Sequence, residues 1–90
     1  MQEDVFDRNA VHVMTFTAAD AGVALAAVRD ELAAEGAQLS SFSLNALNQV
    51  VDGTLRLTNL SCAKARACAD RLAARPGVHG ARVEHHLYRP

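Results

Sequence analysis

The chain has 90 residues, a length that allows one domain with a modest core rather than two domains. Half of the residues are hydrophobic, but much of that half is alanine and there is no tryptophan, so we expect a core of small side chains that gains from self-association. Nine basic and ten acidic residues give a net charge of −1 without a basic run, which argues against a nucleic-acid partner. No apolar stretch approaches the roughly 20 residues that cross a bilayer, and residues 1–9 do not resemble a signal peptide, so we expect a cytoplasmic protein without a membrane partner.

The first half of the chain reads as strand, helix and strand. Residues 1–9 are polar and are expected to form a flexible N-terminal arm, and residues 11–16 are apolar on both faces, as in a central strand. Thr17 and Asp20 have the spacing of a capping box, which predicts a helix that starts between Ala18 and Gly22 and ends at Gly36. The apolar stripe of this helix is predicted to contain Ala21, Leu25, Val28 and Leu32, with Ala27, Asp30 and Glu31 away from it.

A second strand is predicted from Leu39 to Ala46, with a bulge near Ser40 where the apolar positions change from odd to even numbers. The chain then reverses within residues 47–53. Two turns are possible there, Asn48-Gln49 and Asp52-Gly53, and only the second is a strong hairpin signal.

The second half repeats the order of the first. Residues 54–58 alternate between apolar and polar side chains, and residues 81–88 do the same. Between them Ser61 can cap a helix that Pro76 and Gly77 end, with a stripe of Ala65, Cys68, Ala69 and Leu72. Two right-handed crossovers predict an α+β fold, a ferredoxin-like βαββαβ sandwich with a four-stranded antiparallel sheet in the order 4-1-3-2 and both helices on one face.

The residue types that carry metal or nucleophilic chemistry do not converge in this pattern. Cys62 and Cys68 lie about 240° apart around the second helix, which disfavours a disulfide or a shared metal, and no His or Asp lies near Cys62 in sequence. His85 and His86 point to opposite faces of a strand, and a contact of His12 with His86 would still need a third ligand. We therefore expect no catalytic residue, no metal site and no cofactor, and the chain is not expected to be an enzyme.

Other proteins of this architecture carry marks that this chain lacks. A heavy-metal carrier would have Cys-x-x-Cys in the first loop, an RNA-recognition module would have aromatic residues on its central strands, and an acylphosphatase would have a glycine-rich anion loop with an arginine.

A family resemblance is carried by residues 20–39 (DAGVALAAVRDELAAEGAQL) and residues 75–83 (RPGVHGARV). These segments resemble parts of ACT domains, the small amino-acid-sensing modules of metabolic enzymes. The first segment resembles their first loop, helix and start of the second strand, and the second segment resembles the end of their second helix. The similarity spans about residues 10–86 and implies a single ACT-like domain at 10–90. The length and residues 38–44 (QLSSFSL) are most similar to the short regulatory subunits of acetohydroxyacid synthase.

The resemblance implies a non-catalytic regulatory domain, either a homodimer or higher oligomer or the small subunit of a larger amino-acid biosynthetic enzyme. It also implies a possible amino-acid effector, held between the first loop of one copy and the second strand of its neighbour. By position these residues are Asp20, Ala21, Gly22, Val23 and Gln38. Ligand-binding ACT loops commonly read Asp-x-x-Pro-Gly, and this chain has Gly22 and Val23 at the last two places.

A second hypothesis assigns no small molecule to the domain. In this alternative a ferredoxin-like interaction module docks a protein partner on its open sheet face, through Arg56, Arg82, Glu84 and Tyr88.

Overall fold

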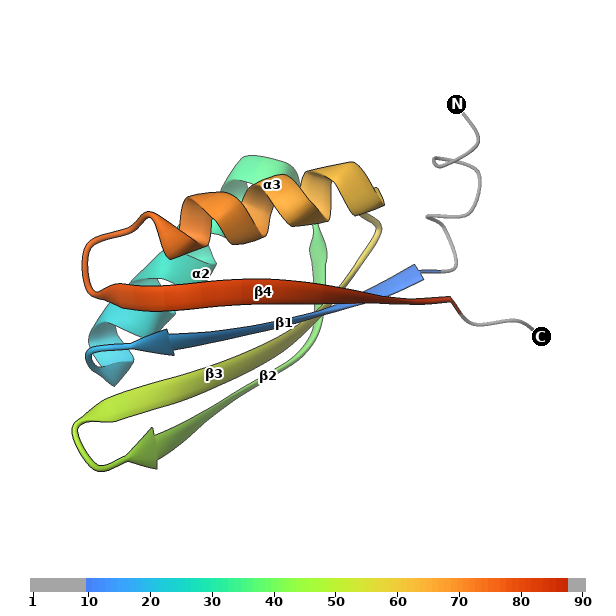
Figure 1. The fold of residues 1–90 in the computed structure, drawn as a ribbon. Coiled ribbons are helices and arrows are strands. Elements are labelled where there is room, and N and C mark those ends of the chain that lie inside the picture. Colours follow the sequence, from blue (N-terminus) through green and yellow to red (C-terminus); the bar gives the residue numbers. More distant parts are fainter. Residues whose placement is uncertain (1–9, 88–90) are drawn as a thin grey trace.

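A computed structural model describes residues 10–87, in which four strands and two helices follow one another in the expected order (Figure 1). The elements are β1 (Ala10–Ala18), α2 (Ala21–Glu35), β2 (Gln38–Leu47), β3 (Val50–Thr58), α3 (Cys62–Ala73) and β4 (Val78–Leu87). The arm predicted at residues 1–9 lies outside the described residues.

The four strands form one antiparallel sheet in the order β2-β3-β1-β4, which is the predicted order 4-1-3-2. Both helices lie against the same face of this sheet (Figure 1). We call the other side, which neither helix covers, the open face. The predicted α+β sandwich is therefore confirmed, with β1 and β3 at its centre and β2 and β4 at its edges.

The core lies between the sheet and the helices and is made mostly of small side chains. Met14 and Leu57 from the central strands and Leu72 from α3 are its largest fully buried apolar side chains. Alternate residues of β1 point into this core and the others point to the open face, as the two-residue period of a strand requires. The stripe predicted for α3 is confirmed, because its buried residues are Ala65, Cys68, Ala69 and Leu72.

The hairpin between β2 and β3 turns at Asn48 and Gln49, which settles the choice between the two turns. Asn48 adopts a positive φ of 29°, a conformation that asparagine tolerates better than most residues. Gly53 lies instead inside β3, opposite Phe16, and a Cβ at this position would lie 2.5 Å from two carbons of the Phe16 ring. The glycine is thus explained by close packing and not by a turn.

The first helix is capped by Asp20, whose Oδ1 accepts a hydrogen bond from the backbone N–H of Val23 at 2.8 Å. The prediction that Thr17 belongs to this cap was wrong. β1 continues to Ala18, so Thr17 is a strand residue, and its hydroxyl donates to Asp52 on the neighbouring strand at 3.0 Å.

Three other local predictions are confirmed. Gly36 ends α2 in the left-handed region with a φ of 67°, and Ser61 caps α3 by accepting from the N–H of Lys64 at 3.1 Å. The pairing of β2 with β3 shifts register between Leu39 and Ser41, at the expected bulge. The α3 helix ends at Ala73, slightly before Arg75, the end that Pro76 and Gly77 predicted.

The predicted buried stripe of α2 was wrong in part, because the helix buries a different side from the one expected. Val28 is buried as expected, but Leu25 is 52% exposed, whereas Ala27 and Glu31, predicted to face water, are buried. The helix is rotated in this way because Glu31 faces α3 and finds two cationic partners there. Arg71 donates to its Oε1 at 2.9 Å, and Arg75 donates to its Oε2 at 2.8 Å and 3.2 Å.

The ion pairs determine the charge state of this buried carboxylate. Burial alone raises the pKa of Glu31, but hydrogen bonds from Arg75 and Arg71 and their positive charges act the other way and together hold the pKa below the ordinary value of 4.5. Glu31 is therefore ionised at neutral pH and links α2 to α3.

Candidate functional site

Four of the five residues predicted to bind a ligand lie together at the start of α2. Only Ala19 and Asp20 connect β1 to this helix, so the loop is shorter than residues 20–23, which the family resemblance implies as the loop. The carboxylate of Asp20 occupies the N–H of Val23, and the side chain of Val23 packs against the core. Ala21 and Gly22 are exposed in the first turn.

Gln38, the fifth predicted residue, lies at the other end of the domain. It pairs with Thr58 at the last residue of β3, whereas the N-terminus of α2 follows Ala18, which pairs with Val51 near the start of β3. The 15 residues of α2 alone span about 22 Å. A single chain therefore does not bring Gln38 to the predicted loop, and a shared site would need a second copy.

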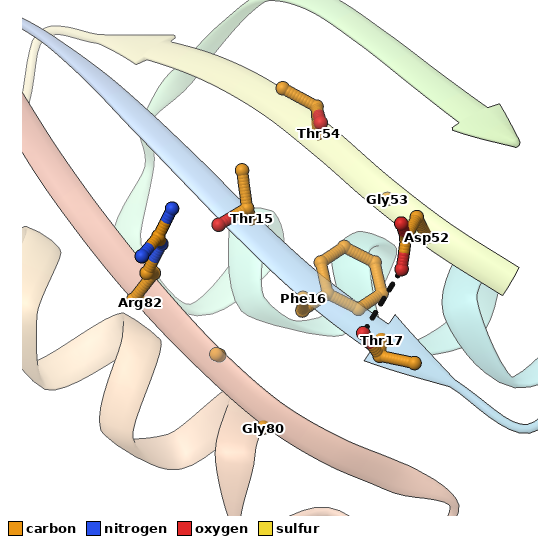
Figure 2. A pocket seen from close by; sticks show the side chains of 9 residues that line it. Thr15, Phe16, Thr17, Asp52, Gly53, Thr54, Gly80 and Arg82 are labelled. Atoms are coloured by element: carbon orange, nitrogen blue, oxygen red, sulfur yellow. Dashed lines mark hydrogen bonds between the residues drawn. The ribbon is translucent and has the colours of Figure 1, made fainter.

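A different hollow lies on the open face, at the end of the sheet where β1 stops (Figure 2). It has a volume of about 480 Å³, within the range of small-molecule sites. We call it the open-face hollow. Its lining residues are Thr15, Phe16, Thr17, Asp52, Gly53, Thr54, Gly80, Ala81 and Arg82.

The hollow exists because β4 has a glycine in its outward row. Gly80 lies directly opposite Thr17, and a Cβ at Gly80 would meet no atom within 4 Å. Its φ of 156° is one that other residues rarely adopt, and the register between β1 and β4 shifts next to it. A local irregularity of the strand thus leaves space where a side chain would otherwise stand.

The polar groups around this space come from three neighbouring strands. Arg82 lies opposite Thr15, and Thr15 lies opposite Thr54, so these three side chains form one row across the sheet. Thr17 and Asp52 form the next row and are joined by the 3.0 Å hydrogen bond (Figure 2). Hydroxyl groups therefore stand between one guanidinium and one carboxylate.

One positive and one negative side chain border this hollow. Arg82 and Asp52 are two strands and two residues apart, which corresponds to about 12 Å between their Cα atoms. A guanidinium binds a carboxylate through two parallel hydrogen bonds, and a carboxylate accepts from an ammonium group. In the described part of the chain Arg82 makes no ion pair that would compete with a ligand.

A second cluster of chemically active side chains lies at the opposite end of the sheet. His12 is fully buried, and its Nδ1 lies 2.8 Å from Nδ1 of His85. The sequence suggested His86 as the partner, but antiparallel register places His12 directly opposite His85 on the inward face. The start of α3 also brings Cys62 to this pair, although no histidine is close to Cys62 in sequence.

The periodicity of the strands could have indicated this pair, since His12 and His85 both belong to inward rows. The spacing of residues along the sequence could not predict the register between β1 and β4, which pairs two histidines that are 73 residues apart.

Comparison with solved structures identifies the fold. The ACT domain from GTP pyrophosphokinase of Chlorobium tepidum superposes with a TM-score of 0.68 at 15% identity, covering 82% of this chain and 96% of that one. The C-terminal domain of the MgtC protein from Mycobacterium tuberculosis has a TM-score of 0.70 at 15% identity, covering 91% and 93%. A formyltetrahydrofolate deformylase from Pseudomonas putida matches over 87% of this chain and 29% of its own, with a TM-score of 0.61 at 10% identity.

These similarities confirm the resemblance to ACT domains at the level of the fold. The sequence matches no family model and no curated protein. In residues 10–87 no helix is long and apolar enough to cross a membrane.

Proposed function

We propose that this chain is a non-catalytic regulatory domain of the ACT type, which binds a small zwitterion such as an amino acid and acts together with a protein partner. The observation that carries the proposal is the open-face hollow, where Arg82 and Asp52 border one space in a domain with the fold of an ACT module. The two charges are complementary to the carboxylate and the ammonium group of an amino acid.

In the proposed complex the ligand carboxylate binds the guanidinium of Arg82, and the ammonium group donates to Asp52. The hydrogen bond from Thr17 holds the Asp52 carboxylate in one orientation, which reduces the entropy that binding would otherwise cost. Thr15 lies on β1, between the two strands that carry Arg82 and Asp52, and its hydroxyl can bind either charged group of the ligand.

The loop implied by the family resemblance is a second proposed location. There a ligand carboxylate would approach the first-turn amides of Ala21 and Gly22, with Gln38 supplied by a second copy. Asp20 weighs against this location, because its negative charge lies beside the same amides. Val23 weighs against it as well, since it stands where ligand-binding loops usually have glycine.

The same proposal includes pairing through the side of the domain formed by α2 and β2. Leu25 and Leu39 are 52% and 42% exposed on these two elements. β2 is an edge strand of ten residues, and such an edge can hydrogen-bond to another chain. The partner is either a second copy or a larger biosynthetic enzyme, of which acetohydroxyacid synthase is the type suggested by the sequence resemblance.

One observation favours an interaction module without a ligand. The open face also has exposed charges outside the hollow, including Arg56 and Glu84 in the row of Val13. Such a mixed-charge surface can orient a protein partner. Tyr88, the fourth residue of that hypothesis, lies outside the described residues.

A thermal-shift screen of the common amino acids at millimolar concentration tests the proposed function. A ligand at ten times its Kd stabilises the native state by about 1.4 kcal/mol, which raises the Tm of a domain of this size by about 6–11 °C. If no amino acid shifts the Tm, amino-acid binding is excluded from the proposed function. A protein partner that is captured equally well with and without amino acids would then favour the interaction module.

Variants of two arginines locate the binding site. Arg82→Gln is expected to abolish the shift, whereas Arg56→Gln, which removes an arginine from the same face outside the hollow, is expected to keep it. Loss of the shift in Gly22→Val with retention in Arg82→Gln would instead assign the ligand to the loop.

A further inference from the structure

The His12–Cys62–His85 cluster joins three elements at the end of the sheet that is remote from the open-face hollow. His12 comes from β1, Cys62 is the first residue of α3, and His85 lies near the end of β4. One nitrogen of each histidine and the sulfur of Cys62 all lie within 4.8 Å of one another. We propose that this cluster binds a divalent, thiolate-preferring metal ion such as Zn²⁺.

The orientation of His12 supports this assignment. Its ring is fully buried and its Nε2–H donates to the backbone carbonyl of Leu60, which fixes the ring and leaves Nδ1 directed at His85. Histidines that bind metals commonly donate their second ring N–H to a carbonyl or carboxylate in this way, because the bond fixes the tautomer. The buried ligand is therefore already oriented by the fold.

The distances are close to those of a tetrahedral ion. Zn–N bonds of about 2.0–2.1 Å and Zn–S bonds of about 2.3 Å place the ligand atoms of a tetrahedral site about 3.3–3.6 Å apart. The Nδ1 atoms of His12 and His85 are 2.8 Å apart, so they need to separate by about half an ångström, and the Cys62 sulfur lies within 4.8 Å of the histidine ligand atoms. His85 and Cys62 are only half-buried, which leaves both side chains room for this adjustment.

Cys62 lies at the start of α3. The first turn of a helix directs backbone N–H groups and the positive end of the helix dipole toward a metal-bound thiolate, which both stabilise. Arg66, one turn further along α3, adds a positive charge and lies 3.5 Å from Nε2 of His85.

The protons balance on metal binding. Without metal, Arg66 donates to Nε2 of His85, and the Nδ1–H of His85 donates to Nδ1 of His12. When the ion binds, Cys62 releases its thiol proton to water, and His85 keeps one proton but carries it on Nε2. Arg66 is exposed and turns away from the new N–H. The product has three protein ligands and leaves a fourth coordination position for water or another donor.

Zinc titration in competition with a chelator tests the proposal. The wild-type protein is expected to bind one Zn²⁺, and Cys62→Ser and His85→Ala are each expected to weaken binding at least tenfold. Cys68→Ala, which removes the other cysteine, and His79→Ala, which removes an exposed histidine, are the matched controls and should bind as the wild type does. His12 is not substituted because its loss from the core threatens folding.

Cobalt absorption provides the second readout. Co²⁺ added to the wild type and to Cys68→Ala is expected to give a thiolate-to-cobalt charge-transfer band that is absent in Cys62→Ser, while circular dichroism reports that all variants are folded. A wild-type protein without this band, or equal zinc affinity in the wild type and Cys62→Ser, would overturn the proposal. The Arg82→Gln variant should keep the band, so the metal site and the proposed ligand site are tested separately.

Discussion

Replacing Glu31 by glutamine tests whether the ion pairs between α2 and α3 organise the packing of the helices. The side chain of Glu31 is 7% exposed and accepts three hydrogen bonds from Arg71 and Arg75, at 2.8 to 3.2 Å. Glutamine has the same shape but no charge, and its NH₂ group would face arginine donors. The variant removes the charge while it leaves the volume of the core unchanged.

The expected loss of stability follows from the exposure of the partners. A charged hydrogen bond contributes about 1.5–3 kcal/mol, but the side chains of Arg71 and Arg75 are 44% and 31% exposed, so water compensates part of the loss. We expect Glu31→Gln to lower the free energy of unfolding by about 2 kcal/mol, which corresponds to a fall in Tm of about 8–16 °C.

Asp30→Asn is the matched control, because it removes the neighbouring carboxylate that binds the same arginine. That pair is 3.4 Å long and Asp30 is 54% exposed, so its loss should cost less than about 0.5 kcal/mol. Urea unfolding at pH 7 measures both variants. Equal stability of the two variants would refute the reasoning, since it would mean that burial adds nothing to the Glu31 pairs.

The difference between the wild type and Glu31→Gln should depend on pH. The pKa of Glu31 is lower in the folded state than its ordinary value of 4.5, so the stabilisation is complete above that value and is lost as the pH falls through the folded pKa. Unfolding curves from pH 7 downward should therefore converge for the two proteins. A constant difference down to the most acidic pH would contradict the assigned charge state.

Three further changes test other parts of the structure. Gly53→Ala places a Cβ against the buried ring of Phe16 and should lower stability by about 1–3 kcal/mol, measured by urea unfolding against the half-exposed neighbour Thr54→Ala, which should cost much less. Asp20→Ala removes the N-cap of α2 and should lower the free energy of unfolding by about 1 kcal/mol. If this variant keeps both its helix content and its stability, Asp20 does not act as a stabilising cap. If the α2–β2 side forms the pairing surface, Leu39→Asp should shift a dimer to a monomer in sedimentation velocity, and a wild-type protein that is already monomeric at high concentration would contradict that surface.

The fold was predicted well from the sequence because the order of strands and helices in each half of the chain is marked by short-range signals. The caps at Asp20 and Ser61, the stop at Gly36 and the alternation in the last two strands are short-range signals, and the handedness of the crossovers then leaves few possible sheets. The four-residue stripe of α3 was predicted without error because the charged residues of this helix, Lys64, Arg66, Asp70 and Arg71, all lie outside it.

The errors have a common physical cause, because they depend on partners that are distant in sequence. Glu31 was assigned to the surface, since nothing near it in the chain reveals that two arginines about 40 residues later neutralise it. Gly53 was predicted as a turn residue, but in the structure it is a strand residue whose missing side chain leaves space for the ring of Phe16.

The candidate sites illustrate the same limit. The family resemblance implied a site at Asp20 and its neighbours, which are adjacent in sequence, whereas the open-face hollow is assembled from three strands. Its charged pair, Arg82 and Asp52, has no short motif. Only the strand register brings these residues, and likewise His12 and His85, to one place.

Backbone amide shifts in a nitrogen-15 NMR titration test the central claim most directly, with the amino acid that raises the Tm most as the ligand. We predict that the amides of Thr15, Thr17, Gly80 and Arg82 shift in a saturable manner and that those of Ala21 and Gly22 do not. Saturable shifts confined to the first turn of α2, or no saturable shift with any amino acid, would contradict the account of the open-face hollow as the ligand site.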